Sequence, residues 1–215
     1  MSRIVVGLDI GTSCIRAVIG EITPEKGVEI IGVAKRPSQG LRNGVIVNID
    51  AAVSVIRDTI ADAELMAGVE VSSVYTAIGG AQVEGLNSQG QVGVDQSGRR
   101  RPLAIDENTK NRVIEAAKQM PLSEDKKLLH VIPQEYIIDG QAGYENPLGY
   151  MGVRLEVKVH LVSASVTTYT HIEQCVVRSG YMLEGVMLKT LAASYAAVHE
   201  EPASTREEPS AFRAL

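Results

Sequence analysis

Three short apolar, β-branched segments follow one another near the N-terminus, and they restrict the fold more than any other feature. They cover residues 3–10, 14–21 and 28–34, and short turns that contain glycine separate them. Consecutive β-rich segments joined by tight turns are typical of an antiparallel meander. The sequence therefore predicts three neighbouring strands at the start of the chain.

The spacing of apolar residues changes after this meander. Within residues 50–67 they recur at helical spacing. We expect Asp50 to cap the start of this helix and Gly68 to end it, since aspartate is a good N-cap and glycine suits the left-handed residue after a helix. Residues 71–78 return to a strand pattern, which completes the order strand, strand, strand, helix, strand.

The clearest alternation in the chain covers residues 153–161. Valine and leucine occupy the odd positions, while charged residues and a histidine occupy the even ones. This pattern predicts a half-buried strand whose odd positions meet the core. Weaker signals predict strands over 81–93, 128–138 and 182–188. The second of these is interrupted at Pro133, which favours an edge or a bulge. Three more helices are predicted: one capped by Asp106 and ending at Met120, one from Thr167 or Thr168 to Gly180, and one over 189–198.

These elements divide into two groups, which predicts an α/β fold with an insertion. Residues 1–80 and 162–198 form one layered α/β system, and a strand–helix–strand–strand block at 81–161 is inserted into it. Residues 199–215 have no periodicity and are rich in Glu, Pro, Ser and Ala, so we predict a disordered tail.

Composition excludes several classes of function. The net charge is −5, so no global positive field attracts nucleic acid or anionic lipid. The cluster Arg99–Arg101 is either a phosphate-binding patch or a solvated loop tip. Two cysteines without framework spacing, no signal peptide and no long apolar stretch indicate a reduced, cytoplasmic compartment.

The turn after the first strand carries the strongest indication of chemistry. Asp9 ends the strand, and Gly11, Thr12 and Ser13 follow almost at once. Small residues leave main-chain N–H groups open to phosphate oxygens, and a carboxylate can hold a hydrated Mg²⁺ ion. An ordinary hairpin turn is the alternative, because Asp, Gly, Thr and Ser are common in turns.

The order of elements around this D-I-G-T turn resembles the first half of the actin-like ATPase fold, and the chain resembles the FtsA family within it. The resemblance extends from about residue 4 to residue 198. It rests on the stretches GLDIGTSCIRAVIGE (7–21), IIGVAKRPSQGLRNGVIVNID (30–50), AELMAG (63–68), SSVYTAIGG (72–80), LHVIPQEYIIDGQ (129–141) and NPLGYMGVRLEVKVHLVSAS (146–165). The last two lie in the inserted block and are the most specific.

This resemblance implies an actin-like (ribonuclease H-like) lobe, subdomain IA, with an inserted β-α-β-β subdomain, IC. It implies a protein that binds ATP and Mg²⁺, has at most weak ATPase activity and self-associates into filaments. Such a protein tethers FtsZ to the cytoplasmic face of the inner membrane at the division septum and recruits other divisome proteins. The resemblance implies no nucleic acid partner.

The resemblance also assigns site residues. Asp9, Gly11, Thr12, Ser13 and Cys14 would form the first phosphate loop, with Asp9 at the metal. Family members commonly have lysine where this chain has Cys14, so one cation fewer is expected there. A second phosphate loop (D-x-G-G-G-T), the adenosine segment, the second lobe and a C-terminal membrane helix are not found, so we expect a truncated chain without activity.

Three alternatives remain open at this stage. A sugar or acetate kinase shares the D-x-G-T turn, although the inserted block offers no obvious catalytic base. A pilus-assembly protein of the PilM type is also actin-like, and a degraded fragment would have no activity. His130, His160 and His171 show no metal-ligand spacing, and Cys175 is interpreted as a core residue.

Overall fold

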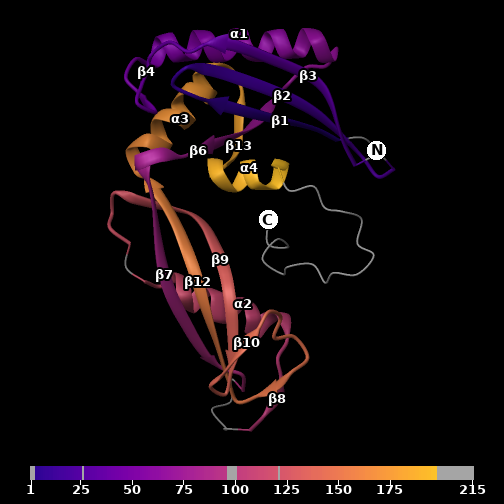
Figure 1. The fold of residues 1–215 in the computed structure, drawn as a ribbon, viewed down its shortest axis with the longest axis vertical. Helices are drawn as coiled ribbons and strands as arrows, with labels where there is room; N and C mark the ends of the chain where they lie inside the picture. Colours follow the sequence, from indigo (N-terminus) through magenta and orange to yellow (C-terminus); the bar gives the residue numbers. More distant parts are fainter. Residues whose placement is uncertain (1–2, 26, 96–100, 121, 198–215) are drawn as a thin grey trace. The chain divides into compact units, whose positions relative to one another are not determined.

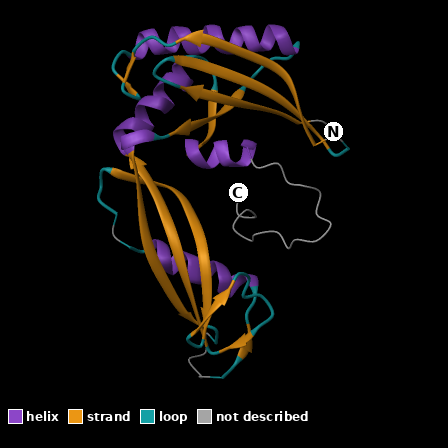
Figure 2. Ribbon diagram, in the orientation of Figure 1, coloured by secondary structure: helices purple, strands orange, loops and turns teal. Residues whose placement is uncertain are grey.

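The chain forms two compact units. The computed structural model describes residues 3–25, 27–95, 101–120 and 122–197. The first unit comprises Met1–Val83 and Ala164–Ala197, and the second comprises Glu84–Ser163 (Figures 1 and 2). The predicted tail at 199–215 lies outside the described residues. No helix in the described part of the chain is long and apolar enough to cross a membrane.

The first unit is built on a five-stranded mixed sheet with the order β13-β6-β1-β2-β3. Its elements are β1 (Arg3–Ile10), β2 (Cys14–Thr23), β3 (Gly27–Pro37), β4 (Leu41–Arg42), β5 (Val45–Ile46), α1 (Ile49–Ala67), β6 (Ser73–Ile78), a short 3-10 helix (Gly80–Gln82), α3 (Val166–Arg178), β13 (Met182–Leu188) and α4 (Lys189–Ala197). The pairs β1–β2 and β2–β3 are antiparallel, which confirms the predicted meander. The pairs β1–β6 and β6–β13 are parallel.

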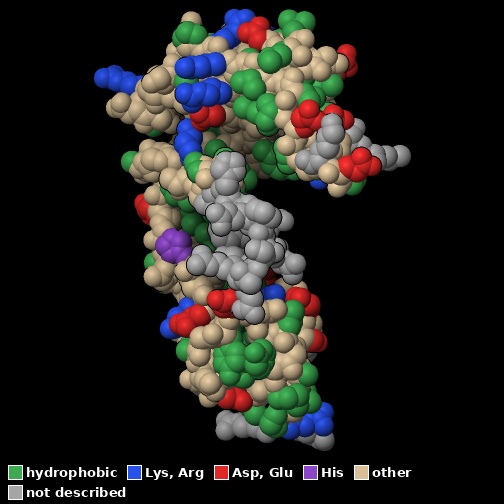
Figure 3. All heavy atoms as spheres, turned by 45° about the vertical axis from the view of Figure 1, so that its right-hand side comes forward, with side chains coloured by type: hydrophobic (Ala, Val, Ile, Leu, Met, Phe, Trp, Pro, Cys, Tyr) green, Lys and Arg blue, Asp and Glu red, His purple; other side chains and the backbone are tan. Residues whose placement is uncertain are grey.

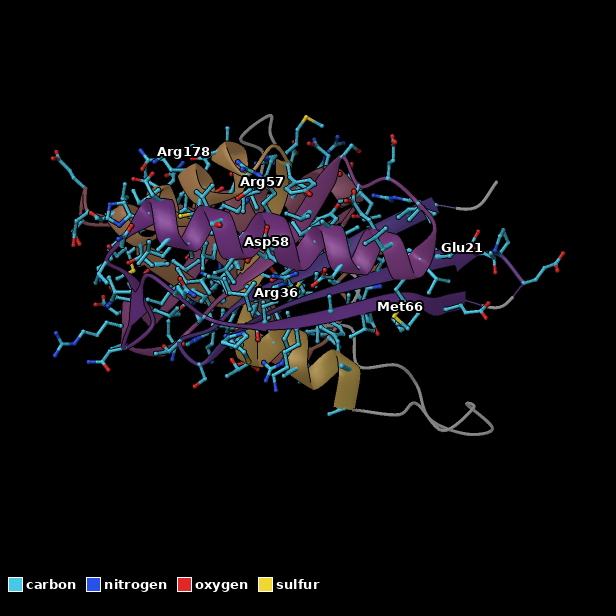
Figure 4. All side chains as sticks on the ribbon, turned by 90° about the horizontal axis from the view of Figure 1, so that it is seen from above. Glu21, Arg36, Arg57, Asp58, Met66 and Arg178 are labelled. Carbon is cyan, nitrogen blue, oxygen red and sulfur yellow. The ribbon has the colours of Figure 1, made fainter. Side chains whose placement is uncertain are left out.

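Helix α1 lies along one face of this sheet and packs against α3, while Figure 1 shows α4 on the opposite side of the sheet. The backbones approach closely at Gly32, where a Cβ atom would lie 2.6 Å from the carbonyl oxygen of Ala63. Beside this contact, Arg36 Nε donates to Asp62 Oδ2 at 2.7 Å, and the Arg36 hydrogen bond is the main cause that lowers the Asp62 pKa. Figure 4 shows Arg36 and Asp58 side by side where β3 meets α1.

The cap of α1 differs from the prediction. Asn48, and not Asp50, is the N-cap: its backbone is extended, and its Oδ1 accepts a hydrogen bond from the Ala51 N–H at 3.1 Å. Asp50 lies in the first turn and pairs with Arg178. The helix therefore starts at Ile49, two residues before the start that a cap at Asp50 would give. Gly68 ends the helix in the left-handed conformation, as predicted.

The second unit contains a four-stranded sheet with the order β10-β9-β12-β7. Its elements are β7 (Val83–Gly93), β8 (Leu103–Ala104), α2 (Glu107–Lys118), β9 (Lys126–Ile138), β10 (Gln141–Tyr144), β11 (Met151–Gly152) and β12 (Arg154–Ser165). Asp106 caps α2 as predicted, accepting from the Thr109 N–H at 2.8 Å. Residues of α2 and of the strands form one buried cluster that contains the predicted odd positions of β12, namely Leu155, Val157, Val159 and Leu161.

Two details of the second unit depart from the predictions. Strand β9 continues through Pro133 without interruption, and its pairs with β10 involve only Tyr136 and Ile138. Glu156, expected on the wet face of β12, is buried. Its carboxylate is satisfied there, because Gln89 Nε2 donates to Oε2 at 2.7 Å and Arg154 Nε lies 2.9 Å from Oε1.

The observed cap gives a prediction that separates two neighbouring residues. We expect Asn48→Ala to lower the free energy of unfolding by about 1 kcal/mol, because the Ala51 N–H loses its partner. Asp50→Ala removes an exposed ion pair and a carboxylate in the first turn of the helix, and should cost less than Asn48→Ala because both interactions are exposed to solvent. Urea denaturation of both variants measures the difference. A larger loss for Asp50→Ala would contradict the assignment of the cap.

The contact between β7 and α2 gives a second prediction. A Cβ atom at Gly90 would lie 2.2 Å from the Val113 carbonyl oxygen and 2.6 Å from the Ala117 nitrogen, and neither backbone atom can move alone. We expect Gly90→Ala to destabilise the second unit by about 1–3 kcal/mol through overpacking. Gly93→Ala on the same strand is the control, since its nearest contact would be 3.6 Å away. Equal denaturation midpoints for the two variants would show that α2 does not pack closely against β7 at Gly90.

Candidate functional site

The turn that joins β1 to β2 has a shape that requires glycine. Ile10 and Ile15 are the last paired residues of the two strands, and the Gly11 N–H donates to the Cys14 carbonyl oxygen at 3.2 Å. A Cβ atom at Gly11 would lie 2.8 Å from that same oxygen. Any other residue would therefore push the turn open. Thr12 and Ser13 follow at its tip, and both are exposed.

The tip of the turn presents free hydrogen-bond donors. Within the described residues, the backbone N–H groups of Thr12 and Ser13 have no hydrogen-bond partner. Two contacts hold this tip in place: the Ser38 N–H donates to the Ser13 carbonyl oxygen at 3.1 Å, and the Gly44 N–H donates to Thr12 Oγ1 at 2.8 Å. Adjacent free amides on a fixed turn are a suitable site for an anion.

Two cations lie against Asp9. Arg16 Nη1 donates to Asp9 Oδ2 at 2.9 Å, and Lys189 Nζ lies 2.6 Å from Asp9 Oδ1. The second contact is close enough for an ion pair but is not oriented as a hydrogen bond. Oδ1 is itself buried and has no hydrogen-bond partner among the described residues. The carboxylate is therefore held on one side by a directed bond and on the other by charge alone.

The parallel strands of the sheet bring these groups together. β1, β6 and β13 run in the same direction, so their carboxyl ends meet at one edge of the sheet. Asp9 lies near the end of β1, Gly79 follows β6, and Lys189 follows β13. Gly79 leaves room for the lysine stem, since a Cβ atom there would lie 3.1 Å from Lys189 Cβ.

Cys14 occupies a different environment from the rest of the predicted site. It is the first residue of β2, and its side chain is buried. It can therefore contribute to the edge of the site through its backbone only. Arg16 follows two residues later on the same strand and is the cross-strand partner of Asp9.

Sequence reasoning missed Arg16 and Lys189. The hairpin register, which pairs residue 9 with residue 16, would have indicated Arg16 once the turn was located. The β4–β5 hairpin that contacts Thr12 was also missed. Its signal is the dipeptide Asn43-Gly44, whose φ angles are 50° and 77°, as a two-residue hairpin turn requires.

The residues present fit Mg²⁺ only as part of a nucleotide complex. No group of three or more His, Cys, Asp or Glu side chains that could hold a metal is found among the described residues. Asp9 is a single carboxylate, and Mg²⁺ is usually bound by one or two carboxylates together with waters and substrate phosphates. A metal bound here would therefore depend on phosphate oxygens for the rest of its coordination.

The other residues considered from the sequence have structural surroundings. Burial lowers the pKa of His130, and His160 Nδ1 lies 2.7 Å from Asn87 Oδ1. Cys175 is fully buried, and burial raises its pKa to about 11, which disfavours the reactive thiolate. Arg101 Nε pairs with Asp95 at 3.2 Å, while Arg99 and Arg100 lie outside the described residues.

Known proteins resemble both units of the chain. Residues 80–163 match the family described as "SHS2 domain inserted in FTSA". The cell division protein FtsA of Borreliella burgdorferi is 41% identical over 202 residues, which cover 94% of this chain and 48% of that protein. The FtsA proteins of Pseudomonas aeruginosa and Escherichia coli are 38% and 35% identical over 199 residues, 93% of this chain and 46% of each protein. The chain thus spans about half the length of the curated relatives it matches.

A solved structure supports the fold independently. A chain of the PilM-PilN type IV pilus biogenesis complex matches with a TM-score of 0.57 at 19% identity, over 89% of this chain and 49% of that chain. This likeness concerns the fold alone, which is an actin-like lobe with an inserted subdomain. The sequence matches, and above all the family match of the inserted block, distinguish FtsA from the kinase and PilM alternatives. The chain belongs to the FtsA family of cell division proteins and corresponds to the N-terminal part of its members.

Proposed function

We propose that this chain is the nucleotide-contacting N-terminal part of an FtsA-type cell division protein, and that its β1–β2 turn binds the phosphates of ATP. One observation carries the proposal: the exposed, unpartnered N–H groups of Thr12 and Ser13 lie next to Asp9 on a fixed turn. Main-chain donors of this kind recognise phosphate oxygens without a side chain in the way.

Each residue of the turn has a separate task in this proposal. Gly11 allows the tight bend, Thr12 and Ser13 supply the donors, and Cys14 supports the start of β2 from the core. Asp9 would hold Mg²⁺ directly or through water, and the ion would neutralise charge on the phosphates. The ligand serves as a structural element between lobes, and at most weak ATP hydrolysis is expected of the whole protein.

The cellular role follows from the relatives, which are named cell division proteins. The proposed protein acts at the cytoplasmic face of the inner membrane at the division septum. There it tethers FtsZ and recruits other divisome proteins, while a membrane-binding helix would belong to a part of the protein beyond this chain. The inserted unit, which matches the SHS2 domain, contributes contacts to partners and to other copies.

Self-association is supported by exposed apolar side chains on an edge strand. β3 is the last strand of the first unit's sheet, and Val28, Ile30 and Val33 on it are 65%, 55% and 48% exposed. Figure 3 shows that hydrophobic side chains also gather at several other places on the face it draws. An exposed apolar edge strand is prone to pair with another chain.

The turn makes a prediction for nucleotide binding. We expect Mg²⁺–ATP to shift the amide NMR signals of Thr12 and Ser13, with a dissociation constant of about 1 mM or weaker because the donors described here come from one unit only. No ATP hydrolysis is expected from this chain. Gly11→Ala should remove the shifts, since its Cβ atom collides with the Cys14 carbonyl oxygen.

Gly7→Ala, on β1 before the turn, is the matched control for that experiment. A Cβ atom at Gly7 meets nothing within 4 Å, so this variant should bind like the unchanged chain. Unmoved Thr12 and Ser13 signals at saturating Mg²⁺–ATP would contradict the proposed site. Tight, micromolar binding by calorimetry would contradict the proposal that a second lobe supplies most of the contacts.

The edge strand makes a prediction for self-association. We expect the chain to form larger species as its concentration rises, and Ile30→Lys to shift that onset to higher concentration by placing a charge on the exposed edge. Sedimentation velocity over a concentration series measures both. Lys35→Ala serves as the control, because Lys35 is exposed on the same strand and its loss adds no charge. A monomer at every concentration would exclude β3 as an association surface.

A further inference from the structure

The charges around the β1–β2 turn do not balance. One carboxylate, Asp9, lies between two cations, Arg16 at 2.9 Å and Lys189 at 2.6 Å. The cluster therefore has one positive charge in excess, next to the free N–H groups of Thr12 and Ser13. An excess positive charge beside free donors favours an anion, and an anion here would lie beside both cations.

The two cations are held in different ways. Arg16 extends from the strand paired with β1, and its guanidinium makes a directed hydrogen bond to Asp9 Oδ2. Lys189 is the first residue of α4, and its ammonium group lies against Oδ1 without hydrogen-bond orientation. Its side chain is 44% exposed. A lysine head on a flexible four-carbon stem can change partners at low cost, whereas a guanidinium in a directed bond is more firmly placed.

We propose that Lys189 is a phosphate-contacting residue of this site, and that its ammonium group moves from Asp9 Oδ1 to the ligand when a polyphosphate binds. The inference rests on the proposed function. In the exchange, Lys189 pairs with a phosphate oxygen, while Asp9 Oδ1 becomes free for a Mg²⁺ ion that arrives with the ligand. Every charge keeps an opposite partner throughout, so no carboxylate is left unpaired.

The position of Lys189 in the fold supports this assignment. β13 is parallel to β6 and β6 is parallel to β1, so the residue after β13 lies at the same edge as the turn. Gly79 lets the Lys189 stem pass close to the end of β6, since a Cβ atom at Gly79 would lie 3.1 Å from Lys189 Cβ. The partly exposed ammonium group is therefore held at this edge, where a ligand can reach it.

The test uses inorganic tripolyphosphate, with and without Mg²⁺, titrated into the chain while the Thr12 and Ser13 amide signals are followed by NMR. Lys189→Met keeps the aliphatic stem and removes only the charge. We expect it to weaken tripolyphosphate binding by about tenfold, the loss typical of one charged hydrogen bond. Lys189→Arg should recover part of the affinity, and Lys118→Ala, which removes a lysine of α2 in the second unit, should leave it unchanged.

A second background separates direct contact from simple neutralisation of Asp9. In Asp9→Asn the carboxylate charge is gone, so Lys189 has nothing to neutralise. If Lys189 contacts the phosphate, adding Lys189→Met to Asp9→Asn still costs about tenfold in affinity. If the cost disappears in this background, Lys189 acts only through Asp9 and the inference is wrong.

The outcomes also separate this inference from the function on which it rests. Equal affinity of Lys189→Met and the unchanged chain, with the Thr12 and Ser13 signals still shifting, overturns the role of Lys189 and leaves the phosphate site intact. The absence of any shift in the unchanged chain overturns both. Thermal unfolding of Lys189→Met beside the unchanged chain establishes that the fold is retained.

Discussion

The parallel pairing of β1, β6 and β13 is the constraint on which the candidate site depends. Leu8 is the partner of Thr76 in β6, and Thr76 is in turn the partner of Val186 in β13. The buried Thr76 hydroxyl donates to the Leu8 carbonyl oxygen at 2.8 Å, which ties β6 to β1 near the end of both strands. Because of this register, Asp9 and Lys189 meet although almost the whole chain separates them. In the sequence the inserted unit lies between β6 and α3, so the pairing of β6 with β13 joins segments on either side of the insertion.

The local sequence correctly predicted those features that depend on residues close together in the chain. The meander, the C-terminal glycine of α1, the cap of α2 and the odd positions of β12 all follow from patterns within one element. The contact of Asp9 with Arg16 was within reach of the same reasoning, because a hairpin fixes its cross-strand pairs. The contact of Asp9 with Lys189 could not be predicted in this way, because a parallel pairing between distant strands leaves no periodic signal near either residue.

The predictions that were wrong or incomplete have two causes. Either two neighbouring residues suited the same role, or a side chain found a partner that the local sequence does not indicate. Asn48 and Asp50 are both good N-caps, and only the path of the chain into α1 selects Asn48. Glu156 sits at a position that alternation assigns to solvent, but Arg154 and Gln89 satisfy its carboxylate and make burial tolerable. Pro133 was expected to interrupt the strand at an edge or a bulge. β9 instead continues through it, and the β10 pairs lie at Tyr136 and Ile138, so Pro133 stands where β9 has no β10 partner and its missing N–H is tolerated.

The net charge of the whole chain is negative, whereas the charge of the site is positive. At short range the charge of the site determines whether a phosphate binds. The net charge of −5 would weakly repel a polyphosphate from a distance. At physiological ionic strength that repulsion is screened beyond about 8 Å, so a bound phosphate experiences mainly the groups beside it. Those groups are two free amides, one carboxylate and two cations. Cys14 brings no charge to this edge, and Arg16 and Lys189 supply it from β2 and from the start of α4. A phosphate site can therefore keep its electrostatic character although its cations come from β2 and from the start of α4, and not from the turn itself.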